Sequence, residues 1–563
     1  MEALKLFSQH APNRTFIAVV FGGLAGLFYA FLIPVVMAAV TNGADNFITE
    51  NAIIEVFGIK VANSELATFF IALCLMILLC KSCSEVLLSR ISLDIRFQLR
   101  KKIYSKINKA PIQTLEHVGV SRLILSLSTD VSSIVMGAQL FPQLLSNGVV
   151  IIGMLGYLAY LDMSAFAYIG KVIVIGVVTY QLPVFLGIGF FRRTREHQDQ
   201  LQEAFKGLVE GAKELRLSPE KRETYERQVL YKQEGIIRTL EKRGMTIFSL
   251  ANNYGNLISF FTIGGLSFIF VNYNSMSVES MMAAIMVLLY VTSPIAILLS
   301  FIPQLARTKI SLRKVNKLFD DLNEEKIAPQ QESLMLWNTI SLKDIEYTHL
   351  SDGDESQFKI GPISLDIVKG EITFIAGGNG SGKSTLAKVI SQHYLPTAGY
   401  FMCDSQIVSD KNFISLRSNI ACIFSDYYLF NRLLNLESLS NEVMNKAQHF
   451  LKVFALDQKV KIKNGRFSTL KLSDGQRRRL ALLVAILDDR DLYVFDEWAA
   501  DQDPEFKDIF YREILPLLKS QNKGIVVVSH DDRYFDAADV LYQMETGKIV
   551  RHIERNFENK ASA

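Results

Sequence analysis

The sequence has little cysteine and almost no excess of charge. Five cysteines among 563 residues cannot build a disulfide-stapled scaffold. Cys80 and Cys83 form a CxxC at helical spacing inside an apolar segment, where packing explains them better than metal binding. The net charge is only +3, from 60 basic and 57 acidic residues, and no basic patch with interleaved aromatics occurs. A disulfide-rich secreted fold and nucleic-acid binding are therefore both excluded.

Charge is also missing from long stretches of the first 310 residues. A segment needs about 20 apolar residues to cross a bilayer. Six segments are long enough, at about 15–40, 66–88, 137–160, 164–190, 247–272 and 280–303. A long polar stretch separates the second segment from the third, and another separates the fourth from the fifth. The pattern predicts six transmembrane helices with two long extensions on one side of the membrane.

Basic residues are unevenly placed around these segments. The stretches 90–122 and 192–243 are rich in lysine and arginine, whereas the loop 41–65 contains only Lys60. By the positive-inside rule, both long stretches, both termini and the C-terminal half are expected in the cytoplasm. The first apolar segment lacks an A-x-A-type end, so we expect a retained helix and not a cleaved signal.

A glycine-rich loop carries the clearest chemistry. Residues 377–384 read Gly-Gly-Asn-Gly-Ser-Gly-Lys-Ser, a complete GxxxxGK[ST] phosphate-binding loop between an apolar strand and a helix. Lys383 is expected to reach the β- and γ-phosphates of ATP, and Ser384 to offer its hydroxyl to Mg²⁺. The candidate nucleotide-binding residues here are Gly377, Asn379, Gly380, Ser381, Gly382, Lys383, Ser384 and Thr385.

Two carboxylates end another apolar strand, Leu492-Tyr-Val-Phe-Asp496-Glu497. Asp496 is expected to hold Mg²⁺ through water, and Glu497 to polarise the water that attacks ATP. Many strands end in this way, so the run alone is weak evidence. The segment Leu472-Ser-Asp-Gly-Gln476, a short distance upstream, removes the ambiguity because it resembles the LSGGQ signature of ABC ATPases.

The resemblance to ABC ATPases implies further roles. Ser473, Gly475 and Gln476 would contact the γ-phosphate held by the P-loop of a second ATPase domain. Three other positions match residues of the family: Tyr347 the aromatic that stacks on adenine, Asp503 the D-loop aspartate, and His530 the switch histidine. A strand tyrosine and a core histidine are the rival interpretations of Tyr347 and His530. With Lys383, Asp496, Glu497 and His530 all present, the resemblance implies ATP hydrolysis, with Glu497, His530 and Lys383 as the catalytic residues.

Two departures from the family concern coupling. Ser425 stands where the Q-loop normally has glutamine, and Asn464–Lys471 replaces the acidic segment that exporters carry before the signature. Each long polar stretch is expected to turn at its far end and dock on the ATPase. The predicted turns are Pro111–Gly119 in the first stretch and Gly211–Pro219 in the second.

Taken whole, the chain resembles an ABC exporter half-transporter of the bacterial inner (cytoplasmic) membrane. The resemblance implies a membrane α-helical domain of six long transmembrane helices followed by an α/β P-loop ABC ATPase domain. The expected boundaries are 1–310 for the membrane domain, 311–338 for a linker and 339–563 for the nucleotide-binding domain. One chain has one P-loop and one signature, so the expected unit is a homodimer in the lipid bilayer.

Three stretches resemble the bacterial cyclic-peptide and siderophore-peptide exporter branch, which includes pyoverdine-precursor and microcin exporters. They are 211–217, 424–430 and 472–482. ATP-driven export of a peptide, cyclic peptide or siderophore-type peptide is therefore expected. Two alternatives stay open: the same architecture moving lipid, drug or imported siderophore, and an ATP-gated regulator without net transport, against which Glu497 argues.

Polar residues inside the apolar segments bear on the cargo. Lys81 lies near the cytoplasmic end of the second span and is expected to snorkel, and Lys171 to do likewise at the outer face. The asparagines and tyrosine at 252–256 are open to two interpretations, interhelical hydrogen bonds or a cavity lining. With the methionines and polar residues at 281–293, such a cavity would suit a sizeable amphipathic solute better than an ion.

Overall fold

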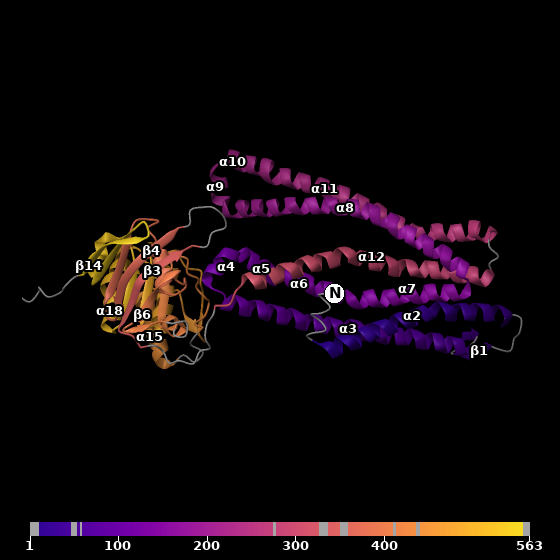
Figure 1. The fold of residues 1–563 in the computed structure, drawn as a ribbon, viewed down its shortest axis with the longest axis horizontal. Helices are drawn as coiled ribbons and strands as arrows, with labels where there is room; N and C mark the ends of the chain where they lie inside the picture. Colours follow the sequence, from indigo (N-terminus) through magenta and orange to yellow (C-terminus); the bar gives the residue numbers. More distant parts are fainter. Residues whose placement is uncertain are drawn as a thin grey trace, which may run out of the picture. The chain divides into compact units, whose positions relative to one another are not determined.

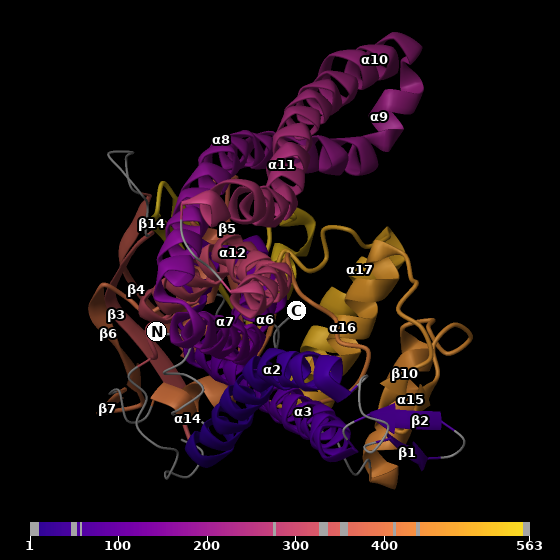
Figure 2. The same ribbon diagram turned by 90° about the vertical axis from the view of Figure 1, so that its right-hand side faces the viewer.

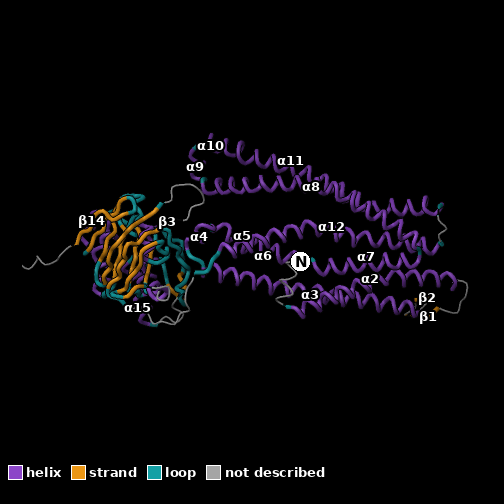
Figure 3. The backbone as a smooth tube through the Cα atoms, viewed as in Figure 1, coloured by secondary structure: helices purple, strands orange, loops and turns teal. Residues whose placement is uncertain are grey.

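The computed structural model describes residues 11–46, 53–56, 59–62, 64–273, 277–325, 336–349, 358–408, 413–434 and 440–554. Two units can be separated. The first, the helical unit, comprises Met1–Ile103 and Ile124–Lys317; the second, the α/β unit, comprises Tyr104–Leu123 and Leu318–Ala563. The only strands in the described part of the helical unit form one hairpin, and all others belong to the α/β unit (Figure 3).

Long helices build the helical unit (Figure 1). The helices that lie wholly or partly in this unit, long and short, are α2 (Pro12–Asn46), α3 (Ser64–Lys109), α5 (Val120–Leu125), η2 (Ser126–Asp130), α6 (Val131–Gln139), α7 (Phe141–Leu161), α8 (Met163–Glu210), α11 (Lys232–Gly264), η4 (Gly265–Ile269), η5 (Phe270–Asn272) and α12 (Val278–Asp321). Taken together with their neighbours, these helices make six stretches that are long and apolar enough to cross a membrane, which confirms the six predicted spans. A hairpin of β1 (Ile53–Val56) and β2 (Ile59–Ala62) occupies the region expected to be a loop between α2 and α3.

Helices α8 and α11 lie side by side well beyond their apolar parts. Buried Leu201 of α8 shares an apolar cluster with Ile237 of α11, and the Tyr225 hydroxyl, shortly before α11, donates to the Ala204 carbonyl at 2.9 Å. At the end of the pair, α9 (Ala212–Leu217) and α10 (Pro219–Thr224) make the turn, and η3 (Tyr225–Tyr231) leads back into α11 (Figure 2). The predicted second docking segment is therefore the tip of a helical extension.

Two large sheets form the centre of the α/β unit. The six-stranded sheet has the order β14-β13-β5-β12-β11-β8, with only β14 antiparallel to its neighbour. Its strands are β5 (Ile372–Gly377), β8 (Ile420–Ile423), β11 (Leu492–Asp496), β12 (Gly524–Val528), β13 (Val540–Glu545) and β14 (Lys548–Glu554). The antiparallel sheet has the order β4-β3-β6-β7, from β3 (Thr339–Thr348), β4 (Lys359–Val368), β6 (Ala398–Cys403) and β7 (Gln406–Ile407). Parallel pairing gathers the carboxyl ends of β5, β11 and β12 at one edge.

Helices cover these sheets and enclose two apolar cores. They are α13 (Lys383–Ile390), α14 (Phe413–Ser418), α15 (Asn441–Val453), α16 (Asp474–Asp488), α17 (Pro504–Ile509), η6 (Phe510–Ile514), α18 (Leu515–Ser520) and η7 (Asp532–Ala537), with a small hairpin of β9 (Ile462–Lys463) and β10 (Arg466–Phe467). One core lies between the sheets around Leu386 and Val494. The other holds Trp498 and Phe510 under α15 and α16. Burial on both faces explains why β5, β11 and β12 are continuous apolar runs.

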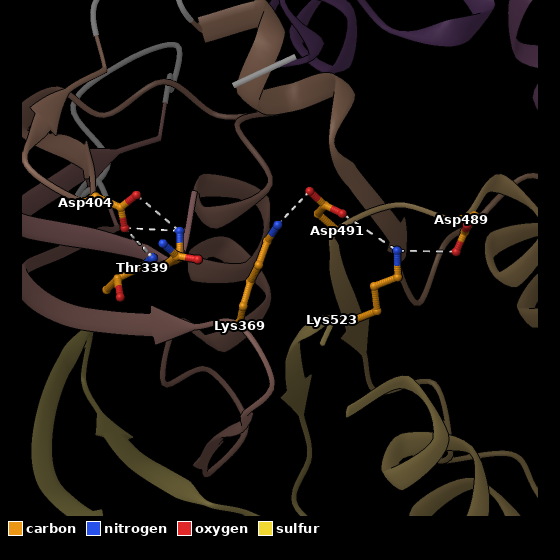
Figure 4. Close-up of polar contacts among 7 residues, drawn as sticks. Thr339, Lys369, Asp404, Asp489, Asp491 and Lys523 are labelled. Carbon is orange, nitrogen blue, oxygen red and sulfur yellow. Dashed lines mark hydrogen bonds and ion pairs between the residues drawn. The ribbon is translucent and has the colours of Figure 1, made fainter. Parts of the chain in front are cut away.

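Charged side chains fasten the opposite edge, where the central strands begin (Figure 4). Lys369 pairs with Asp491 at 2.8 Å, and Lys523 contacts Asp491 at 3.7 Å and Asp489 at 3.3 Å. The Asp404 carboxylate accepts the backbone N–H of Thr339 at 2.8 Å. The lysine–aspartate contacts fix the starts of β11 and β12, and the Asp404 contact fixes the start of β3.

Candidate nucleotide-binding and hydrolysis site

The loop between β5 and α13 is kept open by glycines that no other residue could replace. Gly377 has φ +156°, and a Cβ there would lie 2.3 Å from the Met544 carbonyl oxygen. Gly382 has φ +97°, and its Cβ would lie 2.7 Å from Ile360. Within the described residues, the buried Ser381 hydroxyl has no hydrogen-bond partner. A curved backbone with a spare buried hydroxyl fits a phosphate chain.

Two side chains at the start of α13 face this loop. Lys383 is buried, and its ammonium donates to the Gly378 carbonyl at 2.9 Å. The Ser384 hydroxyl donates to a carboxylate oxygen of Asp496 at 3.0 Å. The fold thus brings the two predicted magnesium ligands, Ser384 of α13 and Asp496 of β11, together beside the predicted phosphate-binding Lys383.

Asp496 ends β11 and is buried to 1% exposure. Burial raises the pKa of its carboxyl, and the negative charges of Glu497 and Asp426 raise it further, against the hydrogen bond from Ser384. A bound cation would relieve this cost, and a hydroxyl with a carboxylate is an all-oxygen donor set of the kind that Mg²⁺ prefers. The residues present fit the ion.

Glu497 leaves the strand in the left-handed region, with φ +49°. Its backbone N–H donates to the Val528 carbonyl at 3.1 Å, which fixes the turn next to β12. The His530 Nδ1 lies 4.0 Å from a Glu497 carboxylate oxygen. The two predicted catalytic side chains therefore meet at the edge where β11 and β12 end.

The predicted signature forms the first turn of α16. Ser473 caps the helix: its hydroxyl accepts the Gln476 N–H at 3.4 Å, and the Gln476 side chain accepts the Ser473 N–H at 3.3 Å. The Gln502 amide donates to the Gly475 carbonyl at 3.0 Å. Arg478 donates to the Glu497 carbonyl at 2.7 Å. Signature and hydrolysis loop are thus joined directly by hydrogen bonds.

Asp503 already has partners within the chain. It caps α17 by accepting the Phe506 N–H at 2.9 Å, and it pairs with Arg479. The capping bond and this arginine hold the pKa of its carboxyl below its usual range. Its position between the signature helix and α17 makes it a structural link as well as a candidate nucleotide contact.

Tyr347 does not present a ring to a nucleotide. The residue is 2% exposed, and Tyr394 stacks on it with centroids 4.8 Å apart and planes at 19°. Burial raises the pKa of the Tyr347 hydroxyl to about 12. This contradicts the predicted adenine-stacking role, because the neighbouring core occupies the ring.

His349 is the aromatic residue that sequence reasoning missed. It follows β3, is only partly buried, and its Nε2 lies 3.3 Å from the Thr385 hydroxyl beside Ser384. Phe358 lies near, with ring centroids 6.1 Å apart and 40% of its surface exposed. His349 lies two residues after Tyr347, so strand alternation places both on the same face and gives no signal that prefers His349.

Comparison with known proteins agrees with this geometry. The ABC transporter family matches residues 360–500. The ATP-binding protein SyrD of Pseudomonas syringae pv. syringae is 32% identical over 504 residues, which cover 87% of this chain and 89% of SyrD. This chain belongs to the ABC transporter family. ABC transporters hydrolyse ATP through this domain and couple hydrolysis to transport, as predicted here.

More distant relatives share the whole ABC architecture. The ATP-dependent lipid A-core flippase of Thiobacillus denitrificans is 25% identical, over 82% of this chain and 80% of the flippase. The structure of a bacterial Atm1-family ABC exporter with ATP bound has a TM-score of 0.74 at 14% identity, covering 97% of this chain and 95% of that one. The predicted fold, six membrane helices followed by an α/β ABC ATPase domain, is confirmed.

The first predicted docking segment of this ABC transporter lies against its ATPase. Residues Ile112–Val118 form the short helix α4, and Ile112 packs on the core between the sheets. Glu116 accepts hydrogen bonds from Lys388 at 2.9 Å and from the Tyr394 hydroxyl. Docking of the Pro111–Gly119 turn is therefore confirmed, whereas the role of Gly211–Pro219 stays a prediction.

The altered Q-loop places a carboxylate near the candidate magnesium ligands. Ser425 is exposed and makes no hydrogen bond to another described residue. The charge of the next residue, Asp426, acts on Asp496 and raises the pKa of its carboxyl. In this ABC transporter it is the charge of Asp426, and not Ser425, that acts on the candidate magnesium ligand Asp496.

Proposed function

We propose that this ABC transporter works as a homodimer in the bacterial inner membrane and exports a peptide, cyclic peptide or siderophore-type peptide. Residues 1–310 form its membrane domain, 311–338 a linker and 339–563 its nucleotide-binding domain. The peptide cargo rests on the resemblance of residues 211–217, 424–430 and 472–482 to peptide exporters. The observation that carries the homodimer is a half-complete ATP site. One chain supplies one phosphate loop and one signature, and the side-chain hydrogen bonds of Ser473 and Gln476 stay within their own turn.

Each side chain of the ATP site has a proposed role. Lys383 binds the β- and γ-phosphates, while backbone N–H groups from Gly377 to Thr385 surround the phosphate chain. Ser384 and Asp496 hold Mg²⁺, which supplies charge neutralisation of the phosphate oxygens when bound. Glu497 orients the attacking water and takes its proton.

His530 and the signature complete the site from two sides. The imidazole lies beside Glu497 and can contact the γ-phosphate, which places it where the site distinguishes ATP from ADP. Ser473, Gly475 and Gln476 of the second copy close over that phosphate, with the N-terminus of α16 directed at the anion. Asp503 carries the connection between the signature helix and α17.

His349 takes the role first expected of Tyr347. Its ring is partly exposed next to Thr385, and a neutral imidazole can stack on adenine as an aromatic surface. Burial lowers the pKa of His349, so the ring is neutral at physiological pH.

A transport assay tests the proposal. Inside-out membrane vesicles that contain the chain should accumulate a tritiated peptide when ATP is added, and vesicles with Glu497→Gln should not. ATP-driven accumulation of a dye or a lipid with no accumulation of any peptide would contradict the proposed cargo. Full hydrolytic activity of a species with the mass of one chain would contradict the homodimer.

A further inference from the structure

A recess in the helical unit brings charges and aromatic rings together among the membrane spans. It has a volume of about 540 Å³, and α2, α3, α7 and α12 line it. Its wall includes Tyr29 from α2, Lys81 and Glu85 from α3, and Tyr290 from α12. Ionisable side chains at this position in a membrane helix are costly and therefore point to function.

The Lys81 side chain points into the recess and away from the end of α3 that is expected in the cytoplasm, which argues against the predicted snorkelling. The Ser84 hydroxyl donates to the Ala18 carbonyl at 2.7 Å, which sets the register of antiparallel α2 and α3. Tyr29 lies about 16 Å further along α2 than Ala18. The Lys81 ammonium is nevertheless 5.8 Å from the centre of the Tyr29 ring. It therefore points away from the basic end of α3, as the tilt of helical side chains toward the N-terminus favours.

Lys81 and Glu85 share a face of α3 because they are four residues apart, yet they do not pair. Within the described part of the chain, neither makes an ion pair within 4.0 Å. Two opposite charges in a low-dielectric recess would gain energy by meeting. Their separation leaves a cation directed at Tyr29 and a carboxylate further along the wall.

Two of the other polar lining side chains are already satisfied by their own helices. The Asn147 amide donates to the Gln143 carbonyl and the Ser300 hydroxyl to the Ile297 carbonyl, both at 2.7 Å. By contrast, the hydroxyls of Tyr29 and Tyr290 have no partner among the described residues. Their ring centroids are 6.3 Å apart, so the two hydroxyl-bearing rings form one wall next to Lys81. The free groups among the described lining residues thus include one ammonium, two phenols and one carboxylate, beside the neutral side chains of Gln143, Ser146 and Ser293.

We propose that this recess binds the charged ends of a zwitterionic, peptide-like cargo. A carboxylate of the cargo binds the Lys81 ammonium with the Tyr29 and Tyr290 hydroxyls, and an ammonium of the cargo binds Glu85. The apolar part of the cargo lies against the tyrosine rings. The volume is in the range of small-ligand pockets, so the recess takes part of a larger cargo. This inference rests on the peptide cargo proposed above and adds which groups of it are recognised.

Transport of three forms of one probe tests the proposal. A tritiated hexapeptide of leucine, alanine and tyrosine is prepared with free ends, with a C-terminal amide and with an N-terminal acetyl group. The half-saturating concentration of ATP-driven uptake is measured for the native chain, Lys81→Met, Lys81→Arg and Glu85→Gln. Lys171→Met, which removes the other lysine of the membrane spans outside the recess, is the control.

The native chain and Lys171→Met should take up the free acid at a concentration about tenfold or more below that of the amide. Lys81→Met should abolish that difference, and Lys81→Arg should keep most of it. Glu85→Gln should keep the preference for the free acid but lose the preference for a free amino end over the acetylated one. Because each variant is compared with itself, lower expression does not alter these ratios.

The outcomes separate the two proposals. If Lys81→Met still distinguished acid from amide, the recess would not bind the carboxylate, while peptide export would stand. If no form of the peptide were taken up and phosphatidic acid in the vesicles stimulated ATP hydrolysis instead, the cargo would be a lipid. The peptide assignment and this inference would then both be wrong.

Discussion

Glu116 of the docking helix α4 accepts a hydrogen bond from Lys388 of the phosphate-loop helix α13 at 2.9 Å. Both residues also contact the Tyr394 hydroxyl, so one side chain from the core holds the pair. Helix α13 begins at Lys383, directly on the phosphates of the proposed site. We therefore expect a displacement of α13 to act on α4 through these contacts, which do not involve the Q-loop.

Breaking this contact should weaken coupling but not ATP binding. Because Glu116 is about half exposed, its pair with Lys388 is worth only about 0.5–1 kcal/mol. Glu116→Gln should lower peptide-stimulated ATP hydrolysis about two- to fivefold. A double-mutant cycle with Lys388→Met measures the interaction, and Lys343→Met, which removes an exposed pair with Asp366, is the control. Additive effects of the two substitutions would show that the pair carries no coupling.

Glu497→Gln should retain ATP binding but lower turnover by about 10²-fold or more, because an amide cannot accept the proton of the attacking water. The variant should accumulate as an ATP-bound dimer, visible as a change in elution volume. Glu505→Gln, which neutralises a carboxylate in the first turn of α17, should hydrolyse ATP normally. Near-native hydrolysis by Glu497→Gln would show that another residue is the general base, and Asp426 and His530 would be the first to examine.

His349→Ala should weaken ATP affinity about tenfold, the loss expected for one stacked base. Tyr347→Phe is the matched test, since it keeps the buried ring and removes only the hydroxyl; its ATP affinity should be unchanged. Binding of a fluorescent ATP analogue measures both. An unchanged affinity for His349→Ala would leave Phe358 as the remaining aromatic surface beside the phosphate loop.

The partly buried His393 should make the α/β unit sensitive to acid. Burial first, and then the charge of Arg417, lower the pKa of its imidazole. The unfolded chain therefore binds a proton more readily, so the free energy of unfolding should fall as pH decreases below about 6.5. The loss is up to about 1.4 kcal/mol per pH unit until the folded-state pKa is reached. Thermal unfolding of the full chain between pH 7.5 and 5.5 should show this decrease. His393→Gln should reduce it, and His349, whose pKa is also lowered by burial, should account for part of what is left.

The sequence predicts those features that are set by residues adjacent in the chain, and it does not predict those that depend on how distant segments pack. The loop Gly377–Ser384 and the six apolar spans could be predicted, because backbone conformation and membrane insertion depend on adjacent residues. Tyr347 was misassigned because β3 shifts register twice, between Leu342 and Ile345 and between Ile345 and Tyr347, so the inward-facing positions could not be counted. The Glu116–Lys388 contact joins residues distant in sequence and depends on how two elements pack.

The altered Q-loop gives the last prediction. Serine is too short to span the gap that glutamine covers in related exporters, and Ser425 contacts no other described residue through a hydrogen bond. Ser425→Ala should therefore leave basal ATP hydrolysis within about threefold, or ~0.6 kcal/mol.

Asp426→Ala should instead change hydrolysis and its magnesium dependence, because the Asp426 charge acts on Asp496. Substitutions in the exposed tip of α9, such as Lys213→Ala with Leu217→Ala, should lower peptide-stimulated hydrolysis and transport while sparing nucleotide binding, since that tip is the proposed second docking segment. Hydrolysis with and without the hexapeptide, over a series of magnesium concentrations, compares all three. If Ser425→Ala abolished hydrolysis while the α9 variants behaved normally, coupling would run through the serine, and its assignment to the docking helices would be wrong.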